Sequence, residues 1–262
     1  MTNLKDIFLL DFAYLETFTK RIDTSWGAIF YNEDQPDYYD ANHAHISEPI
    51  ENPKTIINEV ISFYQSQNLI PRFYLYDPDS HQPLVEELKA HHFGFEELIS
   101  PVQLWDQKVN EKGCFEGISI ELVTKENYSE ALHIECTIEE FGGKEVREKA
   151  FEVEFNHPKF THYLLRYNGK ACSTACIFTH GKQARMESVA TLKEYRGQGF
   201  IGELIHHIQI EVSQRKLENL WVFPINEKIE KVYQKYGFNT VAKLKMGHAF
   251  LGGRSIKDIQ GY

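Results

Sequence analysis

The sequence predicts an α/β (α+β) fold in two successive domains. Short β-branched or aromatic runs alternate with amphipathic stretches of helical length along the 262 residues. The order strand, helix, Gly-Phe occurs twice, ending at Gly94-Phe95 and at Gly237-Phe238. In the second half, a glycine-rich turn joins a β-branched run, 186–192, to an amphipathic helix, 201–215. A strand that runs through a tight turn into a helix is typical of a sheet flanked by helices.

In the N-terminal half, residue spacing predicts these elements: helix 4–22, strand 26–31, loop 32–40, helix 53–67, strand 72–76 and helix 84–91. Asn52 is a plausible N-cap for the second helix, and Pro53 suits its first position. His43 and His45 share a face if they lie in a strand, and with the nearby aspartates they could bind a metal. We favour structural histidines, or substrate contacts from this loop.

Residues 101–117 read as a bridge between the halves, with a polar linker over 106–113. After it, the expected elements are strand 118–123, helices 127–141 and 144–155, strands 161–167, 171–179 and 185–192, helix 201–215, strand 219–223, helix 227–235 and trailing strands from 241. Asn168-Gly169 is a preferred two-residue hairpin turn.

Composition limits the classes of function. Residues 1–115 carry 8 Lys and Arg against 19 Asp and Glu, within a net charge of −10, so no basic stripe can neutralise nucleic-acid phosphates. The acidity suits a cationic or amine substrate, or it serves solubility alone. The sequence has no apolar run of membrane-spanning length and no signal-peptide pattern, so we expect a cytoplasmic protein. The four cysteines lack metal-binding or disulfide spacing, and we interpret them as core residues.

The glycine-rich turn is the strongest chemical signal. Gly197, Gly199 and Gly202 leave backbone N–H groups bare beside a helix N-terminus, and Arg196 adds a positive charge. A diphosphate fits such a turn, although glycines can also serve the turn alone. No Gly-Lys-Ser/Thr follows, which excludes a Walker loop. The glycine spacing matches a dinucleotide fingerprint, but no carboxylate ends strand 219–223 to hold a ribose.

The region 186–238 resembles the GNAT superfamily of acetyl-CoA-dependent N-acetyltransferases. Arg196 to Gly199 match its turn after the fourth strand, and Asn226, Tyr233, Gly237 and Phe238 match its later positions in order. The final small residue of the turn is Ile201 here, with Gly202 one place late. The resemblance implies two GNAT-like domains, each a mixed, mostly antiparallel sheet flanked by helices.

The resemblance also implies acetyl-CoA as a co-substrate and supplies its contacts. Backbones of the fourth strand would bind pantetheine and the acetyl oxygen, the turn would bind the diphosphate, and Asn226 would touch the pantetheine arm or act as an N-cap. The cofactor-binding residues implied are Val189, Ala190, Thr191, Arg196, Gly197, Gln198, Gly199, Phe200, Ile201, Gly202 and Asn226.

Two side chains are candidates for the acetyl-transfer chemistry. Tyr233 occupies the family's general-acid position, or is a structural aromatic. Glu187 is the candidate base, on the face of Val189 and Thr191 if the strand is regular. It could instead select a cationic substrate, or pair with Arg185 or a histidine. This chemistry requires no metal, and we expect none.

We therefore expect a degenerate GNAT-like domain over 1–112 and an acetyltransferase domain over 113–262. The first lacks the Arg-x-x-Gly-x-Gly turn and has Ala90 where the second has Tyr233. A chance recurrence of helix and Gly-Phe is the alternative to this repeat. The expected activity is transfer of acetyl to a primary amine of a small molecule or peptide.

Two other functions are the alternatives to this activity. One is a catalytically weak acyl-CoA-binding or sensing module. The other, an aminoacyl transferase using charged tRNA, is disfavoured by the acidic first half and the intact turn. We expect no nucleic-acid or membrane partner, and either a monomer or a homodimer.

Overall fold

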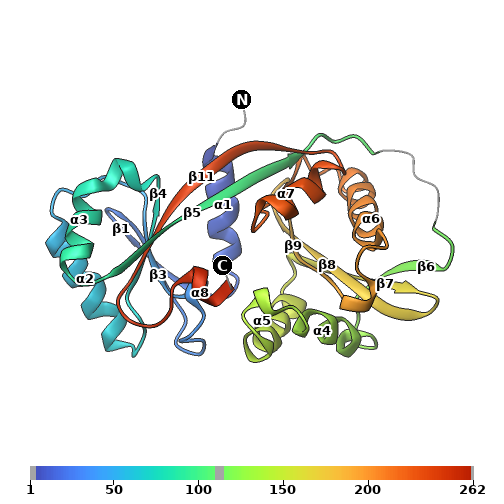
Figure 1. The fold of residues 1–262 in the computed structure, drawn as a ribbon, viewed down its shortest axis with the longest axis horizontal. Helices are drawn as coiled ribbons and strands as arrows, with labels where there is room; N and C mark the ends of the chain where they lie inside the picture. The colour runs from blue at the N-terminus through green and yellow to red at the C-terminus, as the bar shows by residue number, and fades with distance from the viewer. Residues whose placement is uncertain (1–3, 110–114, 261–262) are drawn as a thin grey trace. The chain divides into compact units, whose positions relative to one another are not determined.

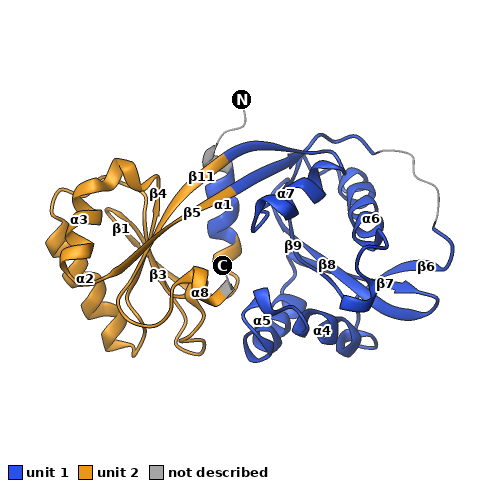
Figure 2. Cartoon of the chain, viewed as in Figure 1, with its two compact units in different colours: residues 1–13, 101–242 blue, residues 14–100, 243–262 orange. Residues whose placement is uncertain are grey.

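The computed structural model describes residues 4–109 and 115–260, and its chain divides into two compact units (Figure 2). Unit 1 comprises Met1–Ala13 and Pro101–Ala242, and unit 2 comprises Tyr14–Ser100 and Lys243–Tyr262. The expected domain boundary between residues 112 and 113 falls within 110–114, outside the described residues. The division also differs from that boundary at both chain ends, because each end belongs to the unit formed mainly by the other half.

Unit 2 is a mixed sheet with helices packed on an apolar core (Figure 1). Its elements are β1 (Lys20–Thr24), β2 (Gly27–Tyr31), β3 (His43–Ile46), α2 (Pro53–Ser66), β4 (Arg72–Tyr76), α3 (Gln82–Ala90) and α8 (Ile256–Gln260), with parts of β5 (Gly94–Trp105) and β11 (Phe238–Phe250). Strands β1, β2 and β3 pair antiparallel, β3 and β4 pair parallel, and β4 and β11 pair antiparallel.

In unit 1 the strands lie in the order β5-β10-β9-β8-β7-β6 and form a mixed arrangement. Its elements are most of α1 (Leu4–Leu15), with β6 (Ile118–Leu122), α4 (Tyr128–Cys136), α5 (Lys144–Asn156), β7 (Phe160–Tyr167), β8 (Lys170–His180), β9 (Gln183–Thr191), α6 (Phe200–Gln214), β10 (Asn219–Val222) and α7 (Glu227–Gln234). Only β9 and β10 pair parallel among these strand pairs of the described chain. Side chains from α6 and α7 pack on one face of the sheet, and side chains from α4 and α5 pack on the other.

Each unit completes its sheet with a strand from the other half of the sequence. In unit 1, β5 pairs antiparallel beside β10, and in unit 2, β11 pairs antiparallel beside β4. Both units then show the same pattern: two antiparallel pairings, one parallel pairing bridged by a helix, and one more antiparallel pairing. The exchange of β5 and β11, together with the assignment of most of α1 to unit 1, is the reason that the compact units depart from a single cut in the chain.

Several predicted bounds are wrong. The first helix ends at Leu15 rather than at residue 22, because the hydroxyls of Thr17 and Thr19 bond the carbonyls of its last turn, and β1 follows. The expected bridge begins inside β5, whose second half is 101–105. Helix α4 ends at Cys136, with a short 3-10 turn at Glu139–Phe141. The trailing strands are one strand, β11.

Local turn and cap chemistry is confirmed. The Asn52 side chain accepts a hydrogen bond from the Thr55 N–H at 3.3 Å, as an N-cap does. Asn168 and Gly169 have φ of +48° and +78° between β7 and β8, the left-handed pair that a tight hairpin needs.

Cys136, Cys172 and Cys176 are free thiols, and Cys114 lies outside the described residues. Within 4–109 and 115–260, the helices are too short or too polar to cross a bilayer.

Candidate active site

The candidate site begins where β9 parts from β10. The two strands pair in parallel from Asn219/Gln183 to Trp221/Arg185, and β10 ends one residue later. Strand β9 continues to Thr191, so its last six residues have no partner in β10 within the described chain. Backbone N–H and C=O groups on that edge are therefore available to a ligand.

A β-bulge lies in the part of β9 that does not pair with β10. Thr174 of β8 faces Ala190 and Cys176 faces Glu187, so Ser188 and Val189 together oppose the single residue Ala175. Ser188 has a φ of +50°, a left-handed conformation that is unusual for serine. A bulge re-aims the backbone and the side chains that follow it.

The bulge overturns the expected placement of Glu187. Glu187 lies on the Cys176 face of the sheet, together with Ala190. Val189 and Thr191 follow the opposite alternation, and Val189 packs against the core that includes α6 and α7. The prediction that Glu187 shares a face with Val189 and Thr191 is wrong, because the extra residue in the bulge shifts the alternation by one.

The glycine turn lies between β9 and α6. Gly197 and Gly199 have φ of +80° and +87°, and a Cβ added at either would contact nothing within 4 Å. Their conformation, and not crowding, therefore favours glycine, and the space beside them is open. Gly202 is different, because a Cβ there would collide with the Tyr236 hydroxyl. It serves the packing of α6.

The remaining residues of the turn divide between exposed and buried. Arg196 is exposed and its Nε donates to the Thr191 carbonyl at 3.0 Å, which ties the turn to the end of β9. Gln198 is exposed and donates to the Glu194 carbonyl at 3.2 Å. The side chains of Phe200 and Ile201 pack into or against the core. Only their backbone atoms can reach a ligand at the turn.

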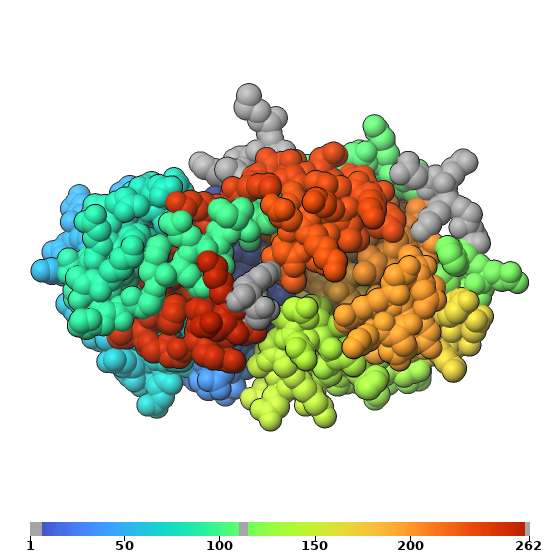
Figure 3. All heavy atoms as spheres, viewed as in Figure 1, coloured from blue at the N-terminus to red at the C-terminus, as the bar shows by residue number. Residues whose placement is uncertain are grey.

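Helix α7 positions the two later motif residues. The Asn226 side chain accepts from the Ile229 N–H at 3.0 Å, so its role as an N-cap is confirmed. Tyr233 is buried, with its ring 5.6 Å from that of Phe238. Burial and then the negative charge of Glu187 raise the pKa of the Tyr233 phenol above its ordinary value. The phenol therefore stays protonated at neutral pH. Figure 3 shows α7, in orange-red, at the surface of unit 1.

Ion pairs hold the side chain of Glu187 in place. Arg185, two residues earlier on the same strand, bonds the Glu187 carboxylate, as one of the sequence-based alternatives anticipated. The Arg185 Nη1 also donates to Asp11 of α1 at 2.5 Å, and its guanidinium lies 4.5 Å from the Phe223 ring centre. Burial raises the pKa of Glu187, and the charge of Arg185 partly offsets that rise.

Sequence reasoning missed part of this environment. Asp11 occurs between apolar helix residues, and no local pattern connects it with a strand more than 170 positions later. Three further buried polar residues line the same sheet face as Glu187: Glu154, His162 and Cys176. His162 and Cys176 could have been noticed as polar positions within strands, but only strand register brings them together.

Comparison with known proteins shows similar folds. Solved structures with similar folds include a functionally unknown conserved protein from Staphylococcus epidermidis (14% identity, TM-score 0.71, covering 95% of this chain and 97% of that one). A GCN5-related N-acetyltransferase from Kribbella flavida matches at 15% identity and TM-score 0.68, covering 97% of both chains. A tandem GNAT protein from the clavulanic acid biosynthesis pathway matches at 12% identity and TM-score 0.55, covering 81% of this chain and 76% of that one.

The chain has the GNAT fold. A family model described as "Increased DNA methylation 1, C-terminal domain" matches residues 145–252, less than half of the chain. No curated protein matches the sequence. The divergence of β9 and β10, the glycine turn and Tyr233 all lie in unit 1.

We predict that Asp11→Asn destabilises the protein by about 1–3 kcal/mol, because it removes one negative charge paired with the largely buried Arg185 guanidinium. Glu218→Gln is the matched control, since Glu218 pairs with Lys182 on the exposed surface of the same unit and is expected to change stability by less than about 1 kcal/mol. Urea unfolding measures both. Equal effects of the two substitutions would contradict the role given to Asp11.

Proposed function

We propose that this chain transfers the acetyl group of acetyl-CoA to a primary amine of a small molecule or peptide. The observation that carries the proposal is the unpaired, bulged end of β9, which leads directly into the glycine turn at the N-terminus of α6. That succession offers backbone groups along a strand edge and then an anion site at a helix N-terminus. An extended arm that ends in a diphosphate matches both.

The turn would hold the diphosphate through its backbone. The N-terminal N–H groups of the 15-residue helix α6 carry the positive end of the helix dipole. Gly197 and Gly199 allow close approach because no side chain covers the backbone there. Arg196 lies at the rim with its charge exposed. These features fit acetyl-CoA, which when bound supplies an activated thioester.

Tyr233 would assist departure of the sulfur. Its raised pKa keeps the phenolic proton in place across neutral pH, so that the hydroxyl can donate to a leaving thiolate. The ring is fixed by packing against Phe238, which limits its freedom to turn away.

Glu187 would accept the proton that the amine loses. A carboxylate with a raised pKa is a stronger base than an exposed one, and the charge of Arg185 partly offsets the rise that burial causes. The acceptor is therefore a group that enters as a cation and reacts as a free amine, beside a carboxylate-rich sheet face. This role also agrees with the acidic composition of the chain.

The alternative is a catalytically weak acyl-CoA-binding or sensing module. It shares the β9 edge and the glycine turn and differs only in turnover. Tyr233 and Glu187 support the enzyme, because a binding module has no need of a buried phenol within the electrostatic influence of a half-buried carboxylate.

Acetyl-CoA is predicted to raise the thermal unfolding midpoint of the wild-type protein. At about 100 times the dissociation constant it contributes roughly 2.7 kcal/mol, which corresponds to a shift on the order of 5–10 °C. In Arg196→Glu the shift is reduced or lost, because a negative charge replaces the cation at the rim. Lys170→Glu, at an exposed position where β8 begins, is the charge-matched control and keeps the shift. An unmoved wild-type midpoint would refute the coenzyme assignment.

Tyr233→Phe is predicted to lower kcat for acetylation of a responsive amine by roughly 100-fold or more, with little change in the KM for acetyl-CoA. The substitution removes only the hydroxyl and keeps the ring that packs in the core. Tyr167→Phe, whose ring contacts Phe200 in the same unit, serves as the control. Steady-state kinetics decides, and unchanged kcat in Tyr233→Phe would leave the phenol a structural aromatic.

The pH dependence of kcat/KM is predicted to show an acid limb from Glu187, since only its ionised form accepts a proton. Arg185→Met removes the positive charge that lowers the pKa of Glu187, so the limb moves to higher pH. Glu187→Gln abolishes this limb, and the remote Arg215→Met leaves it in place. An identical acid limb in wild type and Glu187→Gln would assign it to another group.

A further inference from the structure

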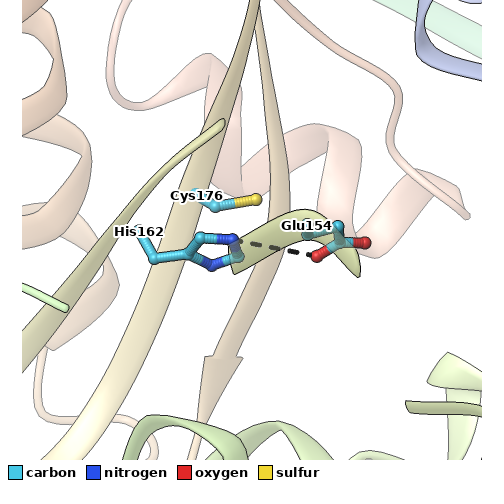
Figure 4. Close-up of side chains that lie close together, drawn as sticks. All are labelled: Glu154, His162 and Cys176. Carbon is cyan, nitrogen blue, oxygen red and sulfur yellow. Dashed lines mark ion pairs between the residues drawn. The ribbon is translucent and has the colours of Figure 1, made fainter. Parts of the chain in front are cut away.

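Three polar side chains form a line across neighbouring strands of unit 1. His162 of β7 lies directly opposite Cys176 of β8, and Cys176 lies directly opposite Glu187 of β9. They occupy the sheet face that is packed by α4 and α5, and Glu154 of α5 reaches the same place. Figure 4 shows Glu154, His162 and Cys176 converging from one helix and two strands. All three are buried, and one ligand atom of each lies within 4.8 Å of the others.

The imidazole nitrogens of His162 make no hydrogen bonds. The residue is 5% exposed, and neither ring nitrogen has a hydrogen-bond partner among the described residues. Its Nε2 lies 4.0 Å from the Glu154 carboxylate, beyond hydrogen-bond distance. A buried imidazole without a partner is costly, and burial lowers its pKa to about 3, so it is the neutral form that a metal ion binds.

Negative charge is in excess around these residues. Arg147 pairs with Glu135 and Glu154, and Arg185 pairs with Asp11 and Glu187, so that two guanidiniums face four carboxylates. Burial is the main cause that raises the pKa of Glu135 to about 8, and the charge of Glu154 adds to the rise against that of Arg147. A cation beside Glu154 would favour the ionised form of these carboxylates.

We propose that Glu154, His162 and Cys176 bind a thiophilic divalent cation, with Zn²⁺ as the best match. One thiolate, one imidazole nitrogen and one carboxylate oxygen are the ligand types that zinc prefers, and three protein ligands leave a fourth position for water. Arg147 bonds the Glu154 carboxylate and thereby orients it. Burial and the nearby carboxylates raise the pKa of Cys176, so the thiol keeps its proton until a bound cation displaces it.

The cation would stabilise the packing of α5 against β7 and β8, and it takes no step in acetyl transfer. The inference is therefore independent of the proposed function. Its ligands are enclosed, so the ion would enter as the chain folds rather than by diffusion into the folded protein.

The test uses the full chain, unfolded in denaturant under reducing conditions and refolded with Co²⁺ in place of zinc. After removal of free metal, we expect equimolar bound cobalt and the near-ultraviolet thiolate-to-cobalt absorption band, both lost when Zn²⁺ replaces the cobalt. Cys176→Ser loses the band. Cys172→Ser is the matched control, because Cys172 is equally buried but belongs to the core on the α6 and α7 side, and it keeps the band.

His162→Gln and Glu154→Gln are expected to retain at least tenfold less cobalt than wild type, with circular dichroism showing the native fold. These two variants test the proposed metal site if Cys176→Ser does not fold. Wild-type protein that retains no cobalt or zinc after refolding, or a band of equal intensity in Cys176→Ser, would overturn the proposal. Cobalt retention that is equal in wild type and both glutamine variants would also overturn it. Because acetyl-CoA is absent throughout, none of these results bears on the acetyltransferase assignment.

Discussion

The candidate site depends on one constraint, the departure of β9 from β10 after Arg185. A strand edge in the middle of a sheet normally has both sides paired, so the last six residues of β9 leave backbone groups without their usual partners. The bulge at Ser188 and Val189 adds to this by turning the strand at the same place. The glycine turn and α6 then continue from the free end, which aligns a strand edge with a helix N-terminus.

The same bulge separates two environments. Thr191 and Val189 face the apolar core beneath α6 and α7, whereas Glu187 faces the buried polar cluster beneath α4 and α5. The charge of Glu187 still raises the pKa of Tyr233, so the two candidate catalytic groups are electrostatically coupled. Arg185 pairs with Glu187, and its positive charge partly offsets the rise in the pKa of Glu187 that burial causes.

The helix caps and tight turns could be predicted from the sequence, but the pairing of strands distant in sequence could not. Asn52, Asn168-Gly169 and the glycines of the turn specify their own conformations through capping or positive φ, so short patterns identify them. The bulge has no such sequence pattern, because Ser188 adopts a left-handed φ without being glycine or asparagine. The exchange of β5 and β11 was not predicted for another reason: the second part of β5 was interpreted as a bridge between the halves, and only the pairing partners of the two strands reveal the exchange. Asp11 and His162 likewise act through partners far away in sequence.

Hydrogen–deuterium exchange of the wild-type chain with and without desulfo-CoA tests most directly whether the free edge of β9 and the glycine turn form one ligand-binding surface. We expect the ligand to slow exchange in peptides covering 188–202, at the bulge and at the first turn of α6, with no comparable change in the β3 to α2 connection, which lacks the glycine turn. Slowed exchange elsewhere in the chain, with 188–202 unchanged at saturating ligand, would contradict it.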